Sequence, residues 1–160
     1  MELQTSEIND VHFLYPGLIF ARTGFHIVTT ILGSCVAVCL WTPNSRIGGI
    51  NHFMLPFWNG EGLPSPKYGN VAIPKLIEKM ATLGIKREHL RAKIFGGSSL
   101  LQNSSGLLVV GERNIMLAEE LLKEEKIPIV SRDVGGSFGR KLMFSTESGE
   151  VLVRKIKNHR

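Results

Sequence analysis

The sequence predicts an α+β or layered α/β fold, in which two main helices pack on a mixed, largely antiparallel sheet. Short runs of β-branched and apolar residues, separated by Gly, Pro, Asn and Ser, fill most of residues 17–54 and return after residue 126. Between them, two segments repeat apolar residues at the spacing of a helix face. Strands that outnumber helices and are grouped along the chain are typical of helices packed on a layer of sheet.

Each expected element is bounded by residues that end regular structure. The first helix, 71–83, follows Asn70 as a candidate N-cap and stops before Gly84, and the second, 112–124, has one apolar and one charged face. Segment 56–68 is rich in Pro and Gly and should be a loop, and 146–149 should be a hairpin turn. Strands are expected at 17–22, 25–32, 35–41, 47–54, 91–95, 127–132, 141–145 and 151–156. Several are apolar on both faces, which predicts a sheet that is covered on both sides.

Length and composition predict one globular domain over residues 1–160. The chain is 43% hydrophobic and 21% charged, and a chain of this length buries roughly 70% of its unfolded surface. Residues 1–10 lack the basic and apolar regions of a secretory signal, and the longest apolar run, 31–41, is shorter than the about 20 residues that span a bilayer. We therefore expect a cytoplasmic protein that is not inserted in a membrane.

The net charge of +5 leaves the class of partner open. The basic residues near the end, Arg154, Lys155, Lys157 and Arg160, either form a solvated tail or attract an acidic partner. A nucleic acid is not the expected partner, because aromatic residues do not alternate with these basic residues and no nucleic-acid motif is present.

Cys35 and His52 are the candidate pair for chemistry. If strands 35–41 and 47–54 form a hairpin with a two-residue turn at Pro43 and Asn44, Cys35 lies directly opposite His52, and opposed Cβ atoms are about 4.5–5.5 Å apart. A slip of one residue would place the two side chains on opposite faces. Pro43-Asn44 is not the usual two-residue hairpin turn, so a longer loop stays open as an alternative.

An imidazole beside a thiol can take its proton, and the resulting thiolate is a good nucleophile toward a carboxamide. The alternative for Cys35 is a small apolar core residue, the usual role of a cysteine in an apolar strand, and the pattern alone leaves both open. Cys39, between Val38 and Leu40, is expected to be a core residue. The two cysteines would lie about 13 Å apart on one strand, too far for a disulfide, and their spacing is not that of a zinc site.

Several segments, taken together, resemble the chemoreceptor glutamine deamidase family CheD. The first two are Leu-Gly-Ser-Cys-Val-Ala-Val at 32–38 and His-Phe-Met-Leu-Pro at 52–56. The resemblance continues in the same order at 67–69, 92–98, 111–114, 133–136 and 146–155, so it covers nearly the whole chain.

This resemblance implies a protein-glutamine deamidase that converts glutamine side chains of methyl-accepting chemoreceptors to glutamate and releases ammonia. It also implies hydrolysis of glutamyl methyl esters in some members, and a fold similar to that of deamidating toxins. The implied partners are the cytoplasmic helices of chemoreceptors and, in some members, a CheC-like chemotaxis phosphatase. A non-catalytic adaptor that binds this phosphatase is the alternative function.

The resemblance also implies the roles of single residues. Cys35 is the implied nucleophile, His52 its general base, and Thr29, six positions before the cysteine, the third catalytic residue. A straight strand would place Thr29 about 20 Å from Cys35, so Thr29 can join them only if the chain turns near Gly33, and Thr30 offers a second hydroxyl beside it.

For the oxyanion of the reaction, the candidate donors are the backbone N–H groups of Gly33, Ser34 and Val36, which flank Cys35. Backbone N–H groups beside a nucleophile are the usual means of holding such a charge. A mechanism of this kind requires neither a metal nor an organic cofactor, and we expect none.

Overall fold

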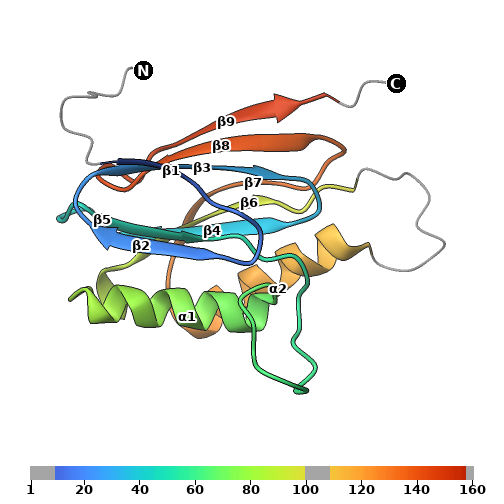
Figure 1. The fold of residues 1–160 in the computed structure, drawn as a ribbon, viewed down its shortest axis with the longest axis horizontal. Helices are drawn as coiled ribbons and strands as arrows, with labels where there is room; N and C mark the ends of the chain where they lie inside the picture. Colours follow the sequence, from blue (N-terminus) through green and yellow to red (C-terminus); the bar gives the residue numbers. More distant parts are fainter. Residues whose placement is uncertain (1–9, 100–108, 158–160) are drawn as a thin grey trace.

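The computed structural model describes residues 10–99 and 109–157, which form three stacked layers. A four-stranded sheet is one outer layer, a five-stranded sheet lies in the middle, and two helices cover the far face of the five-stranded sheet (Figure 1). The expected α+β fold with two helices on mixed sheet is confirmed. The strands form two sheets instead of one, because apolar strands with two buried faces need a second covering layer.

The four-stranded sheet has the order β1-β3-β8-β9. β1 (Asp10–Phe13) pairs in parallel with β3 (His26–Leu32), and β8 (Gly139–Ser145) pairs in antiparallel fashion with both β3 and β9 (Val151–Ile156). The predicted turn between β8 and β9 is confirmed, and it contains Gly149 at φ +78°, a conformation that favours glycine. β1 was not predicted, because a short and mostly exposed edge strand lacks a clear apolar alternation.

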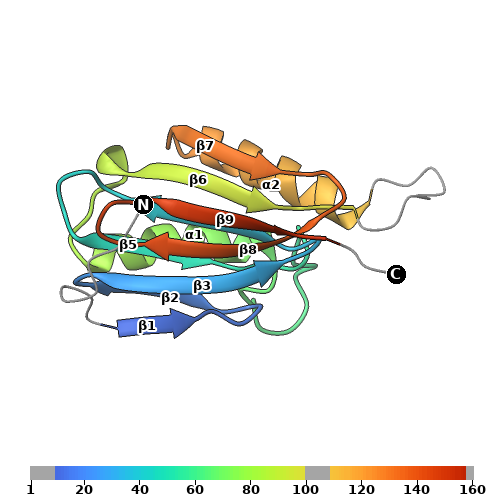
Figure 2. The same cartoon turned by 90° about the horizontal axis from the view of Figure 1, so that it is seen from above.

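The five-stranded sheet has the order β2-β5-β4-β6-β7. β6 and β7 pair in parallel and the other neighbours are antiparallel. Seen from above, β6 and β7 lie beyond β9, the edge strand of the four-stranded sheet, so that sheet does not cover them (Figure 2). The strands span β2 (Ile19–Thr23), β4 (Val36–Trp41), β5 (Ile47–Asn51), β6 (Arg91–Gly96) and β7 (Ile129–Val134).

The two faces of the five-stranded sheet bury separate apolar cores. Helices α1 (Gly69–Thr82) and α2 (Val110–Glu124) pack on one face, over residues such as Val36, Val38 and Leu40 of β4. The alternate residues of the same strand, Ala37 and Cys39, face the four-stranded sheet, where they meet Val28 and Leu32 of β3. A short 3₁₀ helix, η2 (Arg87–His89), precedes β6.

Most element boundaries differ from the predicted ones by one or two residues. At two of the boundaries that differ, an asparagine side chain has another partner. β5 ends at Asn51 instead of Met54, since the Asn51 Oδ1 atom accepts the N–H of Val38 at 2.9 Å where a strand carbonyl would otherwise pair. Asn70 is not the N-cap of α1, which is Tyr68. The Asn70 Oδ1 atom instead accepts the N–H of Trp58 at 2.8 Å and holds the preceding loop.

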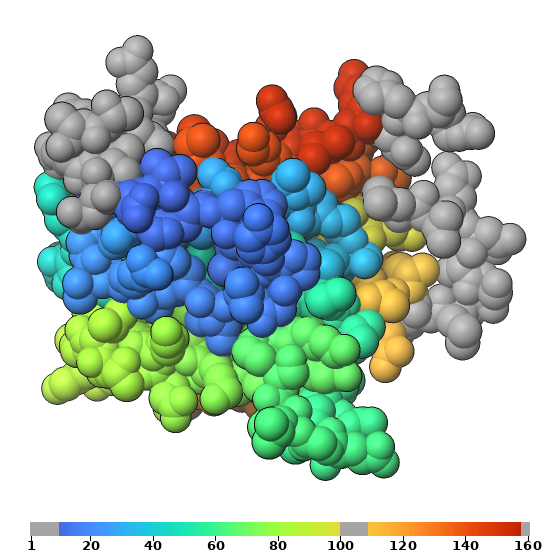
Figure 3. Space-filling view, viewed as in Figure 1, coloured from blue at the N-terminus to red at the C-terminus, as the bar shows by residue number. Residues whose placement is uncertain are grey.

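The predicted loop 56–68 is confirmed and lies beside the start of α1. In the space-filling view, its green segment around residue 60 projects from the body of the molecule (Figure 3). Leu63 in this loop is 90% exposed. None of the helices in the described part of the chain has the length and hydropathy needed to span a bilayer.

Candidate active site

Cys35 lies where the chain passes from one sheet to the other. β3 ends at Leu32 in the four-stranded sheet and β4 begins at Val36 in the five-stranded sheet, so the chain turns between them. Cys35 is half-buried at the edge of the core between the sheets, whereas Cys39 is fully buried within that core. Both cysteines are free thiols, and Cys35 is the one that a substrate can reach.

The backbone of this turn is held by side chains from distant parts of the sequence. Ser98 donates to the carbonyl of Gly33 through its N–H, at 3.0 Å, and through its hydroxyl, at 2.9 Å. The Nδ2 group of the fully buried Asn114 donates to the carbonyls of Ser34 and Met54, both at 3.0 Å. Asn114 therefore ties the loop of Cys35 to the segment that follows His52.

Two glycines complete the support behind Cys35. The N–H of Gly97 donates to the carbonyl of Cys35 at 2.8 Å. Gly96 has φ +102°, and a Cβ atom there would overlap the Cys35 carbonyl oxygen. The close approach of this backbone to the nucleophile loop therefore requires a glycine at position 96.

The same contacts leave some N–H groups of the turn available. The carbonyls of Gly33, Ser34 and Cys35 are all engaged, but among the described residues the N–H groups of Ser34 and Cys35 donate to no other residue; the N–H of Cys35 lies beside its own sulfur. The N–H of Val36, a predicted oxyanion donor, donates to the carbonyl of Phe53 at 3.0 Å. Val36 thus has no free amide hydrogen for an oxyanion.

The predicted pairing of Cys35 directly opposite His52 is wrong by two residues. Cys39 pairs with Ile50, and Val36 bridges to Phe53, so Cys35 lies level with Met54. The connection between β4 and β5 is longer than a two-residue turn, since the last pair before it is Trp41 with Gly48. A shift of two residues preserves the face of the strand, and diagonal neighbours on one face are about 7–8 Å apart. Cys35 and His52 therefore still face the same side.

His52 is enclosed between the two sheets and 1% exposed. Its Nδ1 atom lies 2.8 Å from the hydroxyl oxygen of Thr30, which comes from β3 in the opposite sheet. Its Nε2 atom is also buried and has no hydrogen-bond partner among the described residues. A buried polar atom without a partner is uncommon in proteins and often marks a functional group.

The structure places Thr30, and not Thr29, beside His52. Successive residues of a strand point to opposite faces, and Thr30 shares the inner face of β3 with Val28 and Leu32. Thr29 points outward, where its hydroxyl donates to the carbonyl of His12 at 3.3 Å. The turn after β3 does bring a hydroxyl to the site, but it is the hydroxyl of the neighbouring residue.

Burial sets the charge state of both candidate residues. It lowers the pKa of His52 to about 4, so the imidazole is neutral near pH 7. It also raises the pKa of the Cys35 thiol, an effect that a backbone hydrogen bond at Cys35 partly offsets. At neutral pH the pair is a thiol and a neutral imidazole, a state in which the imidazole can accept the thiol proton.

The sequence prediction assigned the third position to Thr29 and named Thr30 only as a second hydroxyl beside it, and it did not identify Ser98 and Asn114 as anchors of the turn. Thr30 could have been found, because it has the same strand parity as Val28 and Leu32. No local pattern indicates that Ser98 and Asn114 contact the turn, since they lie 65 and 80 residues from their carbonyl acceptors.

The comparisons with known proteins agree with one another. The model of the family CheD, chemotactic sensory transduction, matches residues 54–155. The probable chemoreceptor glutamine deamidase CheD of Trichlorobacter lovleyi is 49% identical over 146 residues, which cover 91% of both chains. Its namesake in Sulfurimonas denitrificans is 43% identical over 145 residues, 90% of this chain and 93% of the relative. This chain therefore belongs to the CheD family.

Proposed function

We propose that this protein deamidates glutamine side chains of chemoreceptors, with Cys35 as nucleophile, His52 as general base and Thr30 as the residue that orients His52. One observation carries the proposal: the unpartnered Nε2 atom of a buried, neutral histidine lies on the same strand face as a half-buried thiol. The printed names of the relatives, probable chemoreceptor glutamine deamidases, supply the substrate class.

In the first step, the sulfur of Cys35 attacks the Cδ atom of the substrate glutamine as the thiol proton passes to Nε2 of His52. The carbonyl oxygen becomes an oxyanion, for which the N–H groups of Ser34 and Cys35, which donate to no other described residue, are the candidate backbone donors on the turn. One such donor is typically worth about 3–4 kcal/mol of transition-state stabilisation. Ser34 is one of the three predicted donors, Cys35 takes the place of Val36, whose N–H donates to Phe53, and Gly33 stays a prediction.

In the second step, Nε2 of His52 returns its proton to the departing nitrogen, which leaves as ammonia, and a thioester remains on Cys35. A water molecule then loses a proton to Nε2 and attacks the thioester carbon. The products are a glutamate side chain and the free thiol. The same sequence hydrolyses a glutamyl methyl ester if methanol, not ammonia, is the leaving group, so we include this activity in the proposal.

The substrate segment would be a cytoplasmic helix of a methyl-accepting chemoreceptor, and the protein would act in the cytoplasm. Conversion of glutamine to glutamate adds a negative charge to that helix at each site. Such a change alters repulsion between neighbouring helices and can shift the balance between receptor signalling states.

Mass spectrometry of a purified cytoplasmic receptor fragment from the same organism tests the proposal. The fragment is incubated with the wild-type protein or with Cys35→Ala, and glutamine peptides are examined for the mass change of conversion to glutamate. Conversion by the wild type alone supports the deamidase and its nucleophile. No conversion by either protein, together with retained binding to a CheC-like phosphatase, would contradict the proposal and favour the adaptor function.

A further inference from the structure

We infer that the turn Leu14–Gly17 fixes the tautomer of His52, and that the backbone carbonyl of Leu14 is a positioning group of the site. The turn follows β1, the one strand that the sequence did not predict. Its contacts determine which ring nitrogen of His52 carries the hydrogen, and this can be measured without substrate. Only the catalytic consequence rests on the function proposed above.

The hydroxyl of Thr30 has one proton and two neighbours. It lies 2.6 Å from the carbonyl oxygen of Leu14 and 2.8 Å from Nδ1 of His52. A carbonyl oxygen can only accept a hydrogen bond, so Thr30 must donate its single proton to Leu14. The Thr30 oxygen is then left as an acceptor, and Nδ1 of His52 must carry the hydrogen that it receives.

This assignment determines the other ring nitrogen. A neutral imidazole has one N–H, and the pKa of His52 is lowered to about 4 by burial. With the hydrogen on Nδ1, Nε2 has a free lone pair, and this is the atom without a partner among the described residues. The opposite tautomer would direct two lone pairs at each other across 2.8 Å in a site where Thr30 is fully buried.

Backbone hydrogen bonds hold the turn both to β3 and to the segment that follows β5. The N–H of Leu14 donates to the carbonyl of Thr29, and the N–H of Gly17 donates to the carbonyl of His52, both at 2.8 Å. The turn thus contacts His52 through the backbone directly and through Thr30 at the side chain. Leu14 itself is 5% exposed and packs in the core between the sheets.

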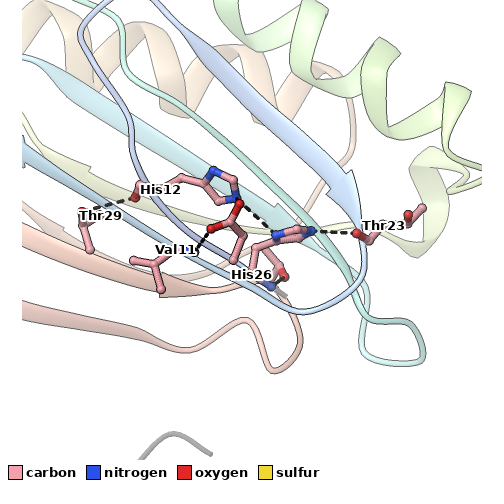
Figure 4. Close-up of polar contacts among 7 residues, drawn as sticks. Val11, His12, Thr23, His26 and Thr29 are labelled. Carbon is pink, nitrogen blue, oxygen red and sulfur yellow. Dashed lines mark hydrogen bonds and ion pairs between the residues drawn. The ribbon is translucent and has the colours of Figure 1, made fainter. Parts of the chain in front are cut away.

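The strand before the turn is also anchored to β3. His12 of β1 and His26 of β3 point toward one another, with 3.2 Å between Nε2 and Nδ1, and His26 Nε2 lies 2.8 Å from the carbonyl of Thr23 (Figure 4). Since that carbonyl only accepts, His26 donates to it through Nε2 and accepts from His12 through Nδ1. This chain of contacts keeps β1, and with it the Leu14 carbonyl, in register on β3.

The tautomer can be observed directly by long-range proton–nitrogen NMR correlation of the ¹⁵N-labelled, full-length protein at pH 7. His52 is assigned by comparison with His52→Gln. The wild type should show hydrogen on Nδ1 and a bare Nε2. Hydrogen on Nε2 of His52 in the wild-type protein would overturn the inference, whether or not the protein deamidates anything.

The role of the Thr30 hydroxyl is tested with a pair of matched variants. Thr30→Val keeps the shape but removes the acceptor, so we expect a mixture of tautomers and a kcat about 10- to 100-fold lower. Thr30→Ser keeps the hydroxyl and should restore the wild-type spectrum and most of the rate. A Thr30→Val protein with the wild-type His52 spectrum would show that the hydroxyl does not set the tautomer.

The Leu14 carbonyl is tested by replacing the Leu14–Tyr15 amide with an ester, whose carbonyl is a weaker acceptor. We expect the Thr30 proton to leave Leu14 part of the time, with a shift of the His52 tautomer toward Nε2–H. The same replacement at the exposed Asn59–Gly60 bond is the control and should leave the His52 signals unchanged. An unchanged spectrum in the Leu14 ester would show that Thr30 alone, and not the Leu14 carbonyl, positions His52.

This inference and the proposed function can fail separately. A wild-type protein that has hydrogen on Nδ1 of His52 but does not deamidate the receptor fragment would contradict the proposed function and leave this inference intact.

Discussion

Two buried histidines near β3, His26 within the strand and His52 opposite Thr30 on its inner face, have different kinds of environment. His26 is buried at 6% exposure, and both of its ring nitrogens have partners, in Thr23 and His12 (Figure 4). His52 is buried more deeply, yet only its Nδ1 atom has a partner. Burial alone therefore does not mark the functional histidine; the atom left without a partner does.

The two cysteines repeat this contrast four residues apart. Cys39 is enclosed between the sheets, and burial raises the pKa of its thiol far above the ordinary value. Cys35 is at the edge of the same layer, on a turn whose carbonyls are all held by hydrogen bonds. A rigid support around an accessible atom is what a nucleophile requires, and complete enclosure is what a core residue requires.

The largest expected difference is between the cysteines. Cys35→Ser should lower deamidation by about 10⁴-fold or more, because the hydroxyl is a much weaker nucleophile at neutral pH. Cys39→Ala, the matched control, should retain the activity and lose about 1 kcal/mol of unfolding free energy. Receptor-fragment deamidation and denaturant unfolding measure the two effects. Loss of activity in Cys39→Ala without loss of stability would contradict the assignment of Cys39 as a core residue with no catalytic role.

The histidines should differ next. His52→Gln should lower kcat by about 10²- to 10⁴-fold, since it removes the proton acceptor of the thiol. His26→Gln should act mainly on folding and lower the unfolding free energy by roughly 1–2 kcal/mol through lost hydrogen bonds. Both proteins are assayed well below their unfolding temperatures. Comparable losses of kcat in the two variants would contradict the assignment of His52 as the base.

A smaller effect is expected at Asn114. Asn114→Asp places a carboxylate oxygen against the carbonyls of Ser34 and Met54, where Nδ2 now donates. We expect at least about a tenfold loss of kcat and roughly 2–3 kcal/mol of unfolding free energy. In Asn70→Asp the acceptor for the N–H of Trp58 is retained, so this variant should behave like the wild type. Equal kcat in Asn114→Asp and the wild type would show that catalysis does not depend on Asn114 as an anchor of the turn.

The smallest expected effect is on the pH dependence of the unfolding free energy. Because the pKa of His52 is about 4 in the folded protein and about 6.5 when unfolded, its contribution to stability is complete above pH 6.5 and is lost as pH falls toward 4. The slope is at most about 1.4 kcal/mol per pH unit. Unfolding of wild type and His52→Gln at pH 7.5 and 5.5 measures it, and the variant should lose less stability. Parallel curves would show that His52 titrates normally.

Much of the fold follows from local patterns. Both helices, the hairpin turn with Gly149 and the loop 56–68 agree with the prediction, because periodicity and turn residues act over short distances. Local patterns could not predict the division into two sheets, because no pattern in the sequence of β3 and β4 indicates that the chain changes sheets at residues 33–35. Similarly, the two-residue error in the register of His52 arose from the length of one loop.

The sequence by itself determined the family resemblance, the candidate pair Cys35 and His52, and the strand parity that places their side chains on one face. Parity survives an error of two residues because side chains alternate with a period of two. Only the tertiary structure decided that Thr30 faces His52 and Thr29 does not, and that Leu14, Ser98 and Asn114 support the site. Those contacts join different sheets and a helix, so they depend on how the layers stack, which no local sequence pattern encodes.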